Sequence, residues 1–291
     1  MKILITGKNG QLGKQLQKQV PAGVTLVAHG RDTVDVANKE QVFSVLGGAK
    51  PDVVINAAAY TAVDKAESDI EQAHAINARG SENLALACRE LGARLIHVST
   101  DFVFDGQQSH PYKPEDYRKP LGVYGESKAR GEEAIEAILP EAIIVRTAWV
   151  YDREGGNFVT TMLRLMNERD QLGVVADQIG TPTWAGTLAQ SIYALAENSE
   201  AKGIYHCTDA GAASWYDFAV AIFEEGKSAG LLPQDKQVKV GPIATADYPT
   251  PAARPAYSVL DKSRLVKEAG VELKHWRQVL RAALNTTELQ K

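Results

Sequence analysis

Tyr124 and Lys128 are the residues of this sequence best suited to acid–base chemistry. They stand four positions apart in "YGESK", at the start of a helical pattern over 124–139, so one helix face presents both side chains. A nearby ammonium favours the phenolate and lowers the pKa of a phenol, which ordinarily lies near ~10. We therefore expect Lys128 to lower the pKa of Tyr124. We expect Tyr124 to move the proton in a hydride transfer at a carbon that bears oxygen.

The segment "STDFVFDG" (99–106) supplies a hydroxyl close to this pair. Thr100 follows the apolar run "RLIHVS" (94–99), which predicts a strand. At a strand end, Thr100 can hydrogen-bond either the substrate oxygen or the tyrosine. A simple polar turn is the alternative. The Y-x-x-x-K spacing is common by chance, so the argument depends on its position after this strand end.

The loop "TGKNGQLG" predicts a dinucleotide site. Gly7, Gly10 and Gly13 follow the apolar strand 3–6 and open a helical pattern. Such glycines allow a tight turn, a close approach of pyrophosphate to the backbone, and close packing of helix on strand, with the helix N-terminus facing the phosphates. A glycine-rich turn without a ligand is the alternative. The G-x-x-G-x-x-G spacing resembles that of the extended short-chain dehydrogenase/reductase superfamily.

The residues after the second strand favour NADPH. An NAD-specific protein would carry an acid directly after this strand to bind the ribose diol, whereas Gly30 and Arg31 stand there. An arginine can hold a 2′-phosphate with two hydrogen bonds, although a solvated arginine is the alternative. Asp32 leaves NADH possible. Further cofactor contacts are expected from Asp35 and Val36 at the adenine and from the small residues Ala57, Ala58 and Ala59, for which tight packing is the alternative.

Apolar runs that alternate with helical patterns must position these residues. Continuous apolar strands of this kind predict an α/β fold of the Rossmann type, with a doubly wound parallel sheet covered on both faces. We expect residues 1–150 to form the NADP-binding domain and residues 151–291 mainly a smaller α/β substrate domain, with segments of 172–207 as candidates to return to the first sheet. The ligand crevice should lie at the carboxyl ends of the strands. The predicted strands are 3–6, 24–28, 52–58, 94–99 and 142–147, and the predicted helices are 11–20, 39–47, 69–92 and 124–139.

Composition and charge exclude several classes of protein. The net charge of −4 argues against a broad nucleic-acid or anionic-membrane surface, and no apolar run approaches the length of a membrane span. An apolar strand that begins at the third residue leaves no room for a signal peptide, so we expect a cytoplasmic protein. Cys88 and Cys207 are expected to be buried, reduced thiols. No zinc-binding spacing of histidines or cysteines occurs.

Seven motifs together resemble the dTDP-4-dehydrorhamnose reductase family over nearly the full length. The resemblance implies that NADPH delivers hydride to the C4 ketone of dTDP-4-dehydro-L-rhamnose, the last step of dTDP-L-rhamnose synthesis. The motifs are "ILITGKNGQLG", "PDVVINAAAYTAVDKAE", "HVSTDFVFDG", "LGVYGESKARGE", "VRTAWVY", "GTPTWAG" and "YPTPAARPAYSVLD".

The resemblance also implies roles for individual residues. Tyr124 would be the proton donor, assisted by Lys128 and Thr100. Arg254 would hold the substrate from the second domain through its diphosphate. The cofactor would contact Gly10, Gln11, Leu12, Arg31, Asp35, Val36, Ala59, Tyr60 and Thr61, and the sugar nucleotide would contact Val63, Thr100, Asp101 and Trp149.

Three other functions are compatible with these motifs. A 4,6-dehydratase would need a second acid after Asp101, where Phe102 stands, and a 4-epimerase keeps its cofactor bound, which Gly30 and Arg31 suit less well. A non-enzymatic NADP-binding regulatory subunit would have no need of a tuned phenol. A homodimer is possible. Some family members join subunits through a magnesium site of acidic side chains, but Gln15 and the acid-free "TWAGTLAQS" argue against such a bridge here.

Overall fold

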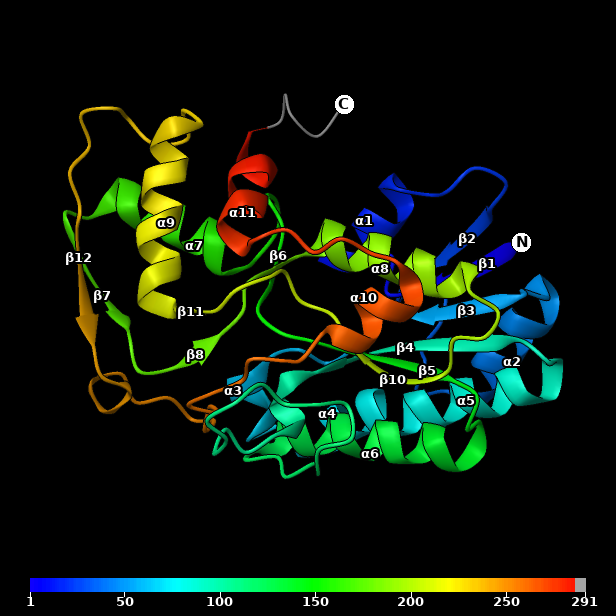
Figure 1. The fold of residues 1–291 in the computed structure, drawn as a ribbon. Coiled ribbons are helices and arrows are strands. Elements are labelled where there is room, and N and C mark those ends of the chain that lie inside the picture. Colours follow the sequence, from blue (N-terminus) through cyan, green and yellow to red (C-terminus); the bar gives the residue numbers. More distant parts are fainter. Residues whose placement is uncertain (286–291) are drawn as a thin grey trace.

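A six-stranded parallel sheet forms the centre of the computed structural model, which describes residues 1–285 (Figure 1). Every neighbouring pair of strands runs parallel, which confirms the predicted doubly wound α/β fold. The edge strand β10 comes from beyond residue 200. The strand order is β10 (Gly203–His206), β5 (Ile143–Thr147), β4 (Arg94–Thr100), β3 (Val53–Asn56), β1 (Lys2–Thr6) and β2 (Thr25–His29).

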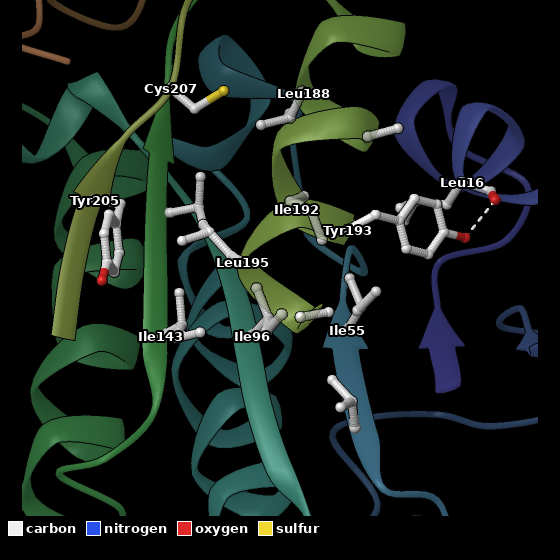
Figure 2. Close-up of a cluster of buried hydrophobic side chains, with 14 of the residues drawn as sticks. Leu16, Ile55, Ile96, Ile143, Leu188, Ile192, Tyr193, Leu195, Tyr205 and Cys207 are labelled. Carbon is white, nitrogen blue, oxygen red and sulfur yellow. Dashed lines mark hydrogen bonds between the residues drawn. The ribbon is translucent and has the colours of Figure 1, made fainter. Parts of the chain in front are cut away.

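Helices cover both faces of this sheet. Figure 1 shows α1 (Gln11–Lys18), α8 (Ala185–Glu197) and α10 (Ser263–Ala269) on one side, and α2 (Lys39–Ala49), α5 (Gly80–Leu91) and α6 (Val123–Ile138) on the other. Side chains alternate between the faces along each strand, so Ile3 and Ile5 join one apolar cluster and Leu4 joins the other. Figure 2 shows Leu188, Ile192 and Leu195 of α8 packed against the sheet. Burial on both faces explains the continuous apolar strands.

The helix predicted over 69–92 differs from the expected continuous α-helix. It consists of α4 (Ile70–His74), the π-helical turn η1 (Ala75–Arg79) and α5, and the short α3 (Val63–Ala66) precedes it. Single π-helical turns are frequent at functional sites. Asn77 of this turn makes two hydrogen bonds with the backbone of Tyr60. Its Oδ1 accepts from the Tyr60 N–H at 2.8 Å, and its Nδ2 donates to the Tyr60 carbonyl at 3.1 Å.

A second apolar core lies in the later part of the chain. Tyr151, Phe218 and Trp276 are among its buried aromatic residues, whereas α8 and β10 pack with the first core. Its helices are α7 (Phe158–Glu168), α9 (Trp215–Ser228) and α11 (Trp276–Leu284). Its strand pairs are β6 (Val150–Tyr151) with β9 (Thr183–Trp184), β7 (Gln171–Val175) with β12 (Lys239–Ile243), and β8 (Ile179–Gly180) with β11 (Ala213–Ser214). Two short 3₁₀ helices lie elsewhere in the chain: η2 (Asp101–Val103) directly follows β4, and η3 (Thr245–Asp247) follows β12.

The two cysteines are free and buried, as predicted. Cys88 lies within α5, and Cys207 directly follows β10. Within residues 1–285, no helix has the length and apolar character needed to cross a membrane.

Candidate active site

Two adjoining cavities open at the carboxyl ends of the parallel strands, where ligands bind in open α/β sheets. The larger has a volume of about 610 Å³ and lies between the ends of β4 and β5 and the start of α6. The smaller has a volume of about 240 Å³ and lies beside the loop after β2. Both are lined by Asn9, Gly10, Ala57 and Ala59, so one extended ligand can reach from one cavity into the other.

The glycine loop has the geometry of a phosphate cradle. Gly7 has a φ of +77°, and a Cβ at Gly13 would lie 2.1 Å from the Gly7 carbonyl oxygen, so both positions need glycine. A Cβ at Gly10 would meet no protein atom closer than 3.4 Å. The space beside Gly10 is therefore open to a ligand. Gly10 is also the N-cap of α1 and provides no side-chain cap, which leaves helix N–H groups free for a phosphate.

Most predicted cofactor residues line the two cavities. The smaller cavity is lined by Gly7, Gly10, Arg31, Asp35, Val36, Ala57, Ala58 and Ala59, and the larger by Gly10, Gln11, Leu12, Gly13, Ala57, Ala59 and Thr61.

Asp32, the acid next to Arg31, pairs with Lys8. Its carboxylate forms an ion pair with Lys8 at 3.1 Å, and this hydrogen bond lowers the pKa of Asp32. Lys8 thus engages the carboxylate next to Arg31, and Arg31 lines the smaller cavity whereas Asp32 does not. The arrangement suits a 2′-phosphate better than a ribose diol.

Tyr124 and Lys128 both line the larger cavity from α6, but one expectation about them is wrong. Burial raises the pKa of Tyr124 to about 12; a hydrogen bond with Thr100 opposes the rise and the charge of Asp101 adds to it. Lys128 does not lower this pKa. Its Nζ is directed to β4, where it donates to the Val98 carbonyl at 2.7 Å and lies 3.1 Å from His97 Nε2. Tyr124 is therefore a protonated phenol at neutral pH, which is the form that donates a proton.

Thr100 and Asp101 lie at the end of β4, next to Tyr124. The Thr100 hydroxyl donates to Asp101 Oδ1 at 3.1 Å and accepts from the Phe102 N–H at 3.2 Å. Burial raises the pKa of Asp101 to about 6, and the hydroxyls of Ser258 and Thr100 oppose this rise. The Phe102 ring packs edge-on against the Tyr124 ring, with centroids 5.4 Å apart.

Trp149 and Val63 form further walls of the larger cavity. Trp149 has a φ of +48°, which is uncommon for a bulky residue, and its ring stacks on Trp215 with centroids 3.6 Å apart. Gly180 also lies against this ring, since a Cβ there would be 2.6 Å from Trp149 Cε2. The second core thus fixes an aromatic ring at the site.

Tyr60 and Arg254 are not brought to either cavity. The Tyr60 hydroxyl donates to Asp69 Oδ2 at 3.1 Å. Arg254 forms two hydrogen bonds with the Asp64 carboxylate, at 3.0 and 2.8 Å. Asp64 is the neighbour of Val63, so Arg254 lies beside the cavity wall while its guanidinium is engaged by an acid.

The structure adds residues that the sequence did not single out. The loop 154–157 also lines the larger cavity, and Asn157 Nδ2 donates to Gln11 Oε1 at 2.9 Å. The "GGN" that precedes α7 was a possible signal for this loop. His97 is another such residue, because in sequence it is one position of an apolar run.

Gln15 Nε2 donates to Asp152 Oδ2 at 2.8 Å, and no group of three or more potential metal ligands occurs within residues 1–285.

Comparisons with known proteins agree on one family. The model of the family described as RmlD substrate binding domain matches residues 1–289. The dTDP-4-dehydrorhamnose reductase of Aggregatibacter actinomycetemcomitans is 45% identical over 293 residues, which cover 96% of this chain and 97% of that one. The structure of a dTDP-4-dehydrorhamnose reductase from Clostridium acetobutylicum aligns with a TM-score of 0.91 at 41% identity and covers 100% of both chains. The enzyme of that name from Bacillus anthracis, in complex with NADP, aligns with a TM-score of 0.91 at 36% identity and covers 97% of this chain and 98% of that one.

Proposed function

The chain belongs to the family described as RmlD substrate binding domain, and on that premise we propose that it is an NADPH-dependent dTDP-4-dehydrorhamnose reductase. It would reduce the C4 ketone of dTDP-4-dehydro-L-rhamnose to the alcohol of dTDP-L-rhamnose. The observation that carries the proposal is the meeting of Thr100, Tyr124 and Lys128 in a cavity continuous with an open glycine loop. Relatives of this name are similar over nearly the whole chain.

The residues of the glycine loop fit a dinucleotide. The open helix N-terminus at Gly10 would hold the pyrophosphate, and Arg31 would hold the 2′-phosphate. Ala57 and Ala59 would leave room along the cofactor, and Lys128 would bind the nicotinamide ribose. NADPH, when bound, supplies the hydride; NADH would bind more weakly because it has no phosphate for Arg31.

Tyr124 would donate the proton. As hydride reaches C4, the C=O bond becomes a C–O single bond and its oxygen takes the phenolic proton of Tyr124. Thr100, whose hydroxyl is close enough to oppose the rise in the pKa of Tyr124, would hold the same oxygen. The raised pKa of Tyr124 keeps the phenol protonated before this step, which suits reduction better than oxidation.

The second core would recognise the sugar nucleotide. We propose that Trp149, Val63 and Asp101 contact the substrate, and that Arg254 exchanges Asp64 for the substrate diphosphate when the ligand binds. Residues 1–150 with α8 and β10 would then form the cofactor half, and the rest of the chain the substrate half. The free, buried cysteines support a cytoplasmic location, since reduced thiols persist there.

Two alternatives fit the site less well. A dehydratase needs a second carboxylate after Asp101, and the ring of Phe102 occupies that place against Tyr124. A regulatory subunit would bind NADPH without using it. Buried side chains such as Lys128 (2% exposed) and Asp101 (2% exposed) are costly to keep in a pure binding module.

A direct assay tests the proposal. NADPH absorbance is followed with dTDP-4-dehydrorhamnose as the substrate, and the product is identified by NMR. We expect substrate-dependent oxidation of NADPH and formation of dTDP-L-rhamnose, and the variant Tyr124→Phe serves as the matched control. NADPH binding without oxidation would favour the regulatory subunit. Release of water from dTDP-glucose with no net oxidation of NADPH would favour a dehydratase.

A further inference from the structure

A row of buried polar side chains crosses three strands and ends at Lys128. The register pairs Thr6 of β1 with Asn56 of β3, and Asn56 with His97 of β4. Each of the three is 1% exposed. The Thr6 hydroxyl donates to Asn56 Oδ1 at 2.7 Å, Asn56 Nδ2 lies 2.9 Å from His97 Nδ1, and His97 Nε2 lies 3.1 Å from Lys128 Nζ.

The orientation of the Asn56 amide is fixed by the backbone. The Ala58 N–H points at Asn56 Oδ1 at 3.1 Å, and a backbone N–H can only donate. The atom that faces Ala58 must therefore be the amide oxygen. The amide nitrogen, which also can only donate, then faces His97 Nδ1.

This orientation sets the tautomer of His97. Because Nδ1 accepts a hydrogen bond from Asn56, the ring proton of a neutral His97 is on Nε2. The Nε2–H then points at Lys128 Nζ. An ammonium has three donors and no acceptor, so two donors would face each other in a buried place. A neutral amine has a lone pair that accepts from His97 while one of its own N–H groups donates to the Val98 carbonyl at 2.7 Å.

We propose that His97, held as the Nε2–H tautomer by Asn56, is a positioning residue that favours the neutral amine of Lys128 over its ammonium in the cofactor-free protein. The consequence for catalysis rests on the proposed function. Burial keeps Tyr124 a phenol, and an amine at Lys128 adds no charge that would favour the phenolate, so the site is set to donate a proton rather than to take one. His97 touches neither ligand in this scheme and acts through Lys128.

The charged groups around Lys128 support this arrangement. Burial lowers the pKa of Lys128 to about 8, and Glu132, one turn further along α6, opposes that shift. Glu132 itself is paired with Arg146 and Arg118. Burial lowers the pKa of His97 well below its usual range, so the ring does not become doubly protonated. Asp101 and Tyr124 also face this part of the cavity, and the clash of donors adds to the effect of burial on Lys128.

The tautomer can be measured directly by NMR of the full chain labelled with ¹⁵N-histidine, without cofactor. We expect Nε2 of His97 to carry the proton and Nδ1 to have the shift of an acceptor, with the signal assigned from His97→Gln. His206 provides an internal reference of the opposite kind, because its Nδ1 lies 3.0 Å from the Tyr112 carbonyl oxygen and must donate. Protonation of His97 at Nδ1 would overturn the proposal.

Three variants test the effect on Lys128 through its ¹³Cε titration. In Asn56→Asp, the carboxylate accepts from Nδ1–H, which frees Nε2 to accept from an ammonium. In His97→Gln, the amide oxygen can do the same without added charge. Both should raise the Lys128 pKa by about one unit, a tenfold change in the ratio of ammonium to amine. Thr6→Val is the control, because Ala58 still fixes Asn56, and it should leave the tautomer unchanged.

The outcomes separate this inference from the proposed function. A rise of the Lys128 pKa in Asn56→Asp without a rise in His97→Gln would mean that only the added charge acts. That result would overturn the role of the tautomer. If a variant fails to fold, the wild-type tautomer still decides the question. An inactive wild type with the Nε2–H tautomer would refute the reductase alone, and an active wild type with the Nδ1–H tautomer would refute this inference alone.

Discussion

Glu132 offers the sharpest test of how α6 is held beneath the active site. Its carboxylate is fully buried and accepts hydrogen bonds from Arg146 at 2.7, 3.0 and 3.2 Å and from Arg118 at 2.9 Å. The change Glu132→Gln keeps the shape and removes the charge. It leaves Arg146, which is 1% exposed, without a charged partner in the interior.

The structure sets the size of the expected loss. Burial raises the pKa of Glu132, but Arg146, Ser99 and Arg118 more than reverse this and lower it from 4.5 to about 2. Such a fall corresponds to about 3 kcal/mol of stability, within the range of roughly 3–5 kcal/mol for breaking a buried ion pair. Because the folded-state pKa is the lower one, this stability is fully present above pH 4.5 and is lost as the pH falls toward 2.

Urea unfolding, followed by circular dichroism and by tryptophan fluorescence, measures this loss. Coincident transitions permit a two-state free energy. We expect Glu132→Gln to lower the free energy of unfolding by about 3 kcal/mol at pH 7, with the difference from wild type about 1 kcal/mol smaller at pH 3.5. Glu136→Gln is the matched control, since Glu136 is 40% exposed and should contribute less than about 1 kcal/mol. Equal losses in the two variants, or a difference that does not depend on pH, would refute the reasoning.

Three further predictions concern the ligands. Tyr124→Phe should lower kcat by about 10²–10⁴-fold with little change in NADPH affinity, because the new ring keeps its edge contact with Phe102; single-turnover kinetics and fluorescence titration measure both quantities, and near-normal turnover would remove Tyr124 from its role. Arg31→Ala should weaken NADPH binding by about tenfold to hundredfold, the effect of losing a charged hydrogen bond, and should weaken NADH binding much less; calorimetry with each cofactor decides, and equal losses would reject the 2′-phosphate contact. Gly180→Ala should raise KM for the sugar nucleotide and leave NADPH affinity unchanged, because its Cβ would lie 2.6 Å from Trp149, and overpacking of this kind costs about 1–3 kcal/mol; an unchanged KM would mean that the Trp149 ring does not position the substrate.

Local patterns in the sequence were enough to predict the sheet and many of the residues that line the two cavities. Continuous apolar strands between amphipathic helices predict a parallel sheet covered on both faces, because only such a sheet buries both sides of every strand. The glycines at 7, 10 and 13 and the pair Tyr124 and Lys128 depend on turn geometry and helix period, which act over a few residues. For that reason the strands lie close to where the sequence predicts them, and most residues expected to bind the cofactor line the two cavities.

Long-range contacts decided the electrostatics of the site. The sequence predicted that Lys128 lowers the pKa of Tyr124, yet burial raises it, because desolvation depends on everything that surrounds the phenol and not on the residue four positions away. The partner of Lys128 is His97, 31 positions earlier, and that of Arg254 is Asp64, 190 positions earlier. Pairings of this kind arise only when strands and helices pack, since tertiary packing brings together side chains that no local pattern relates.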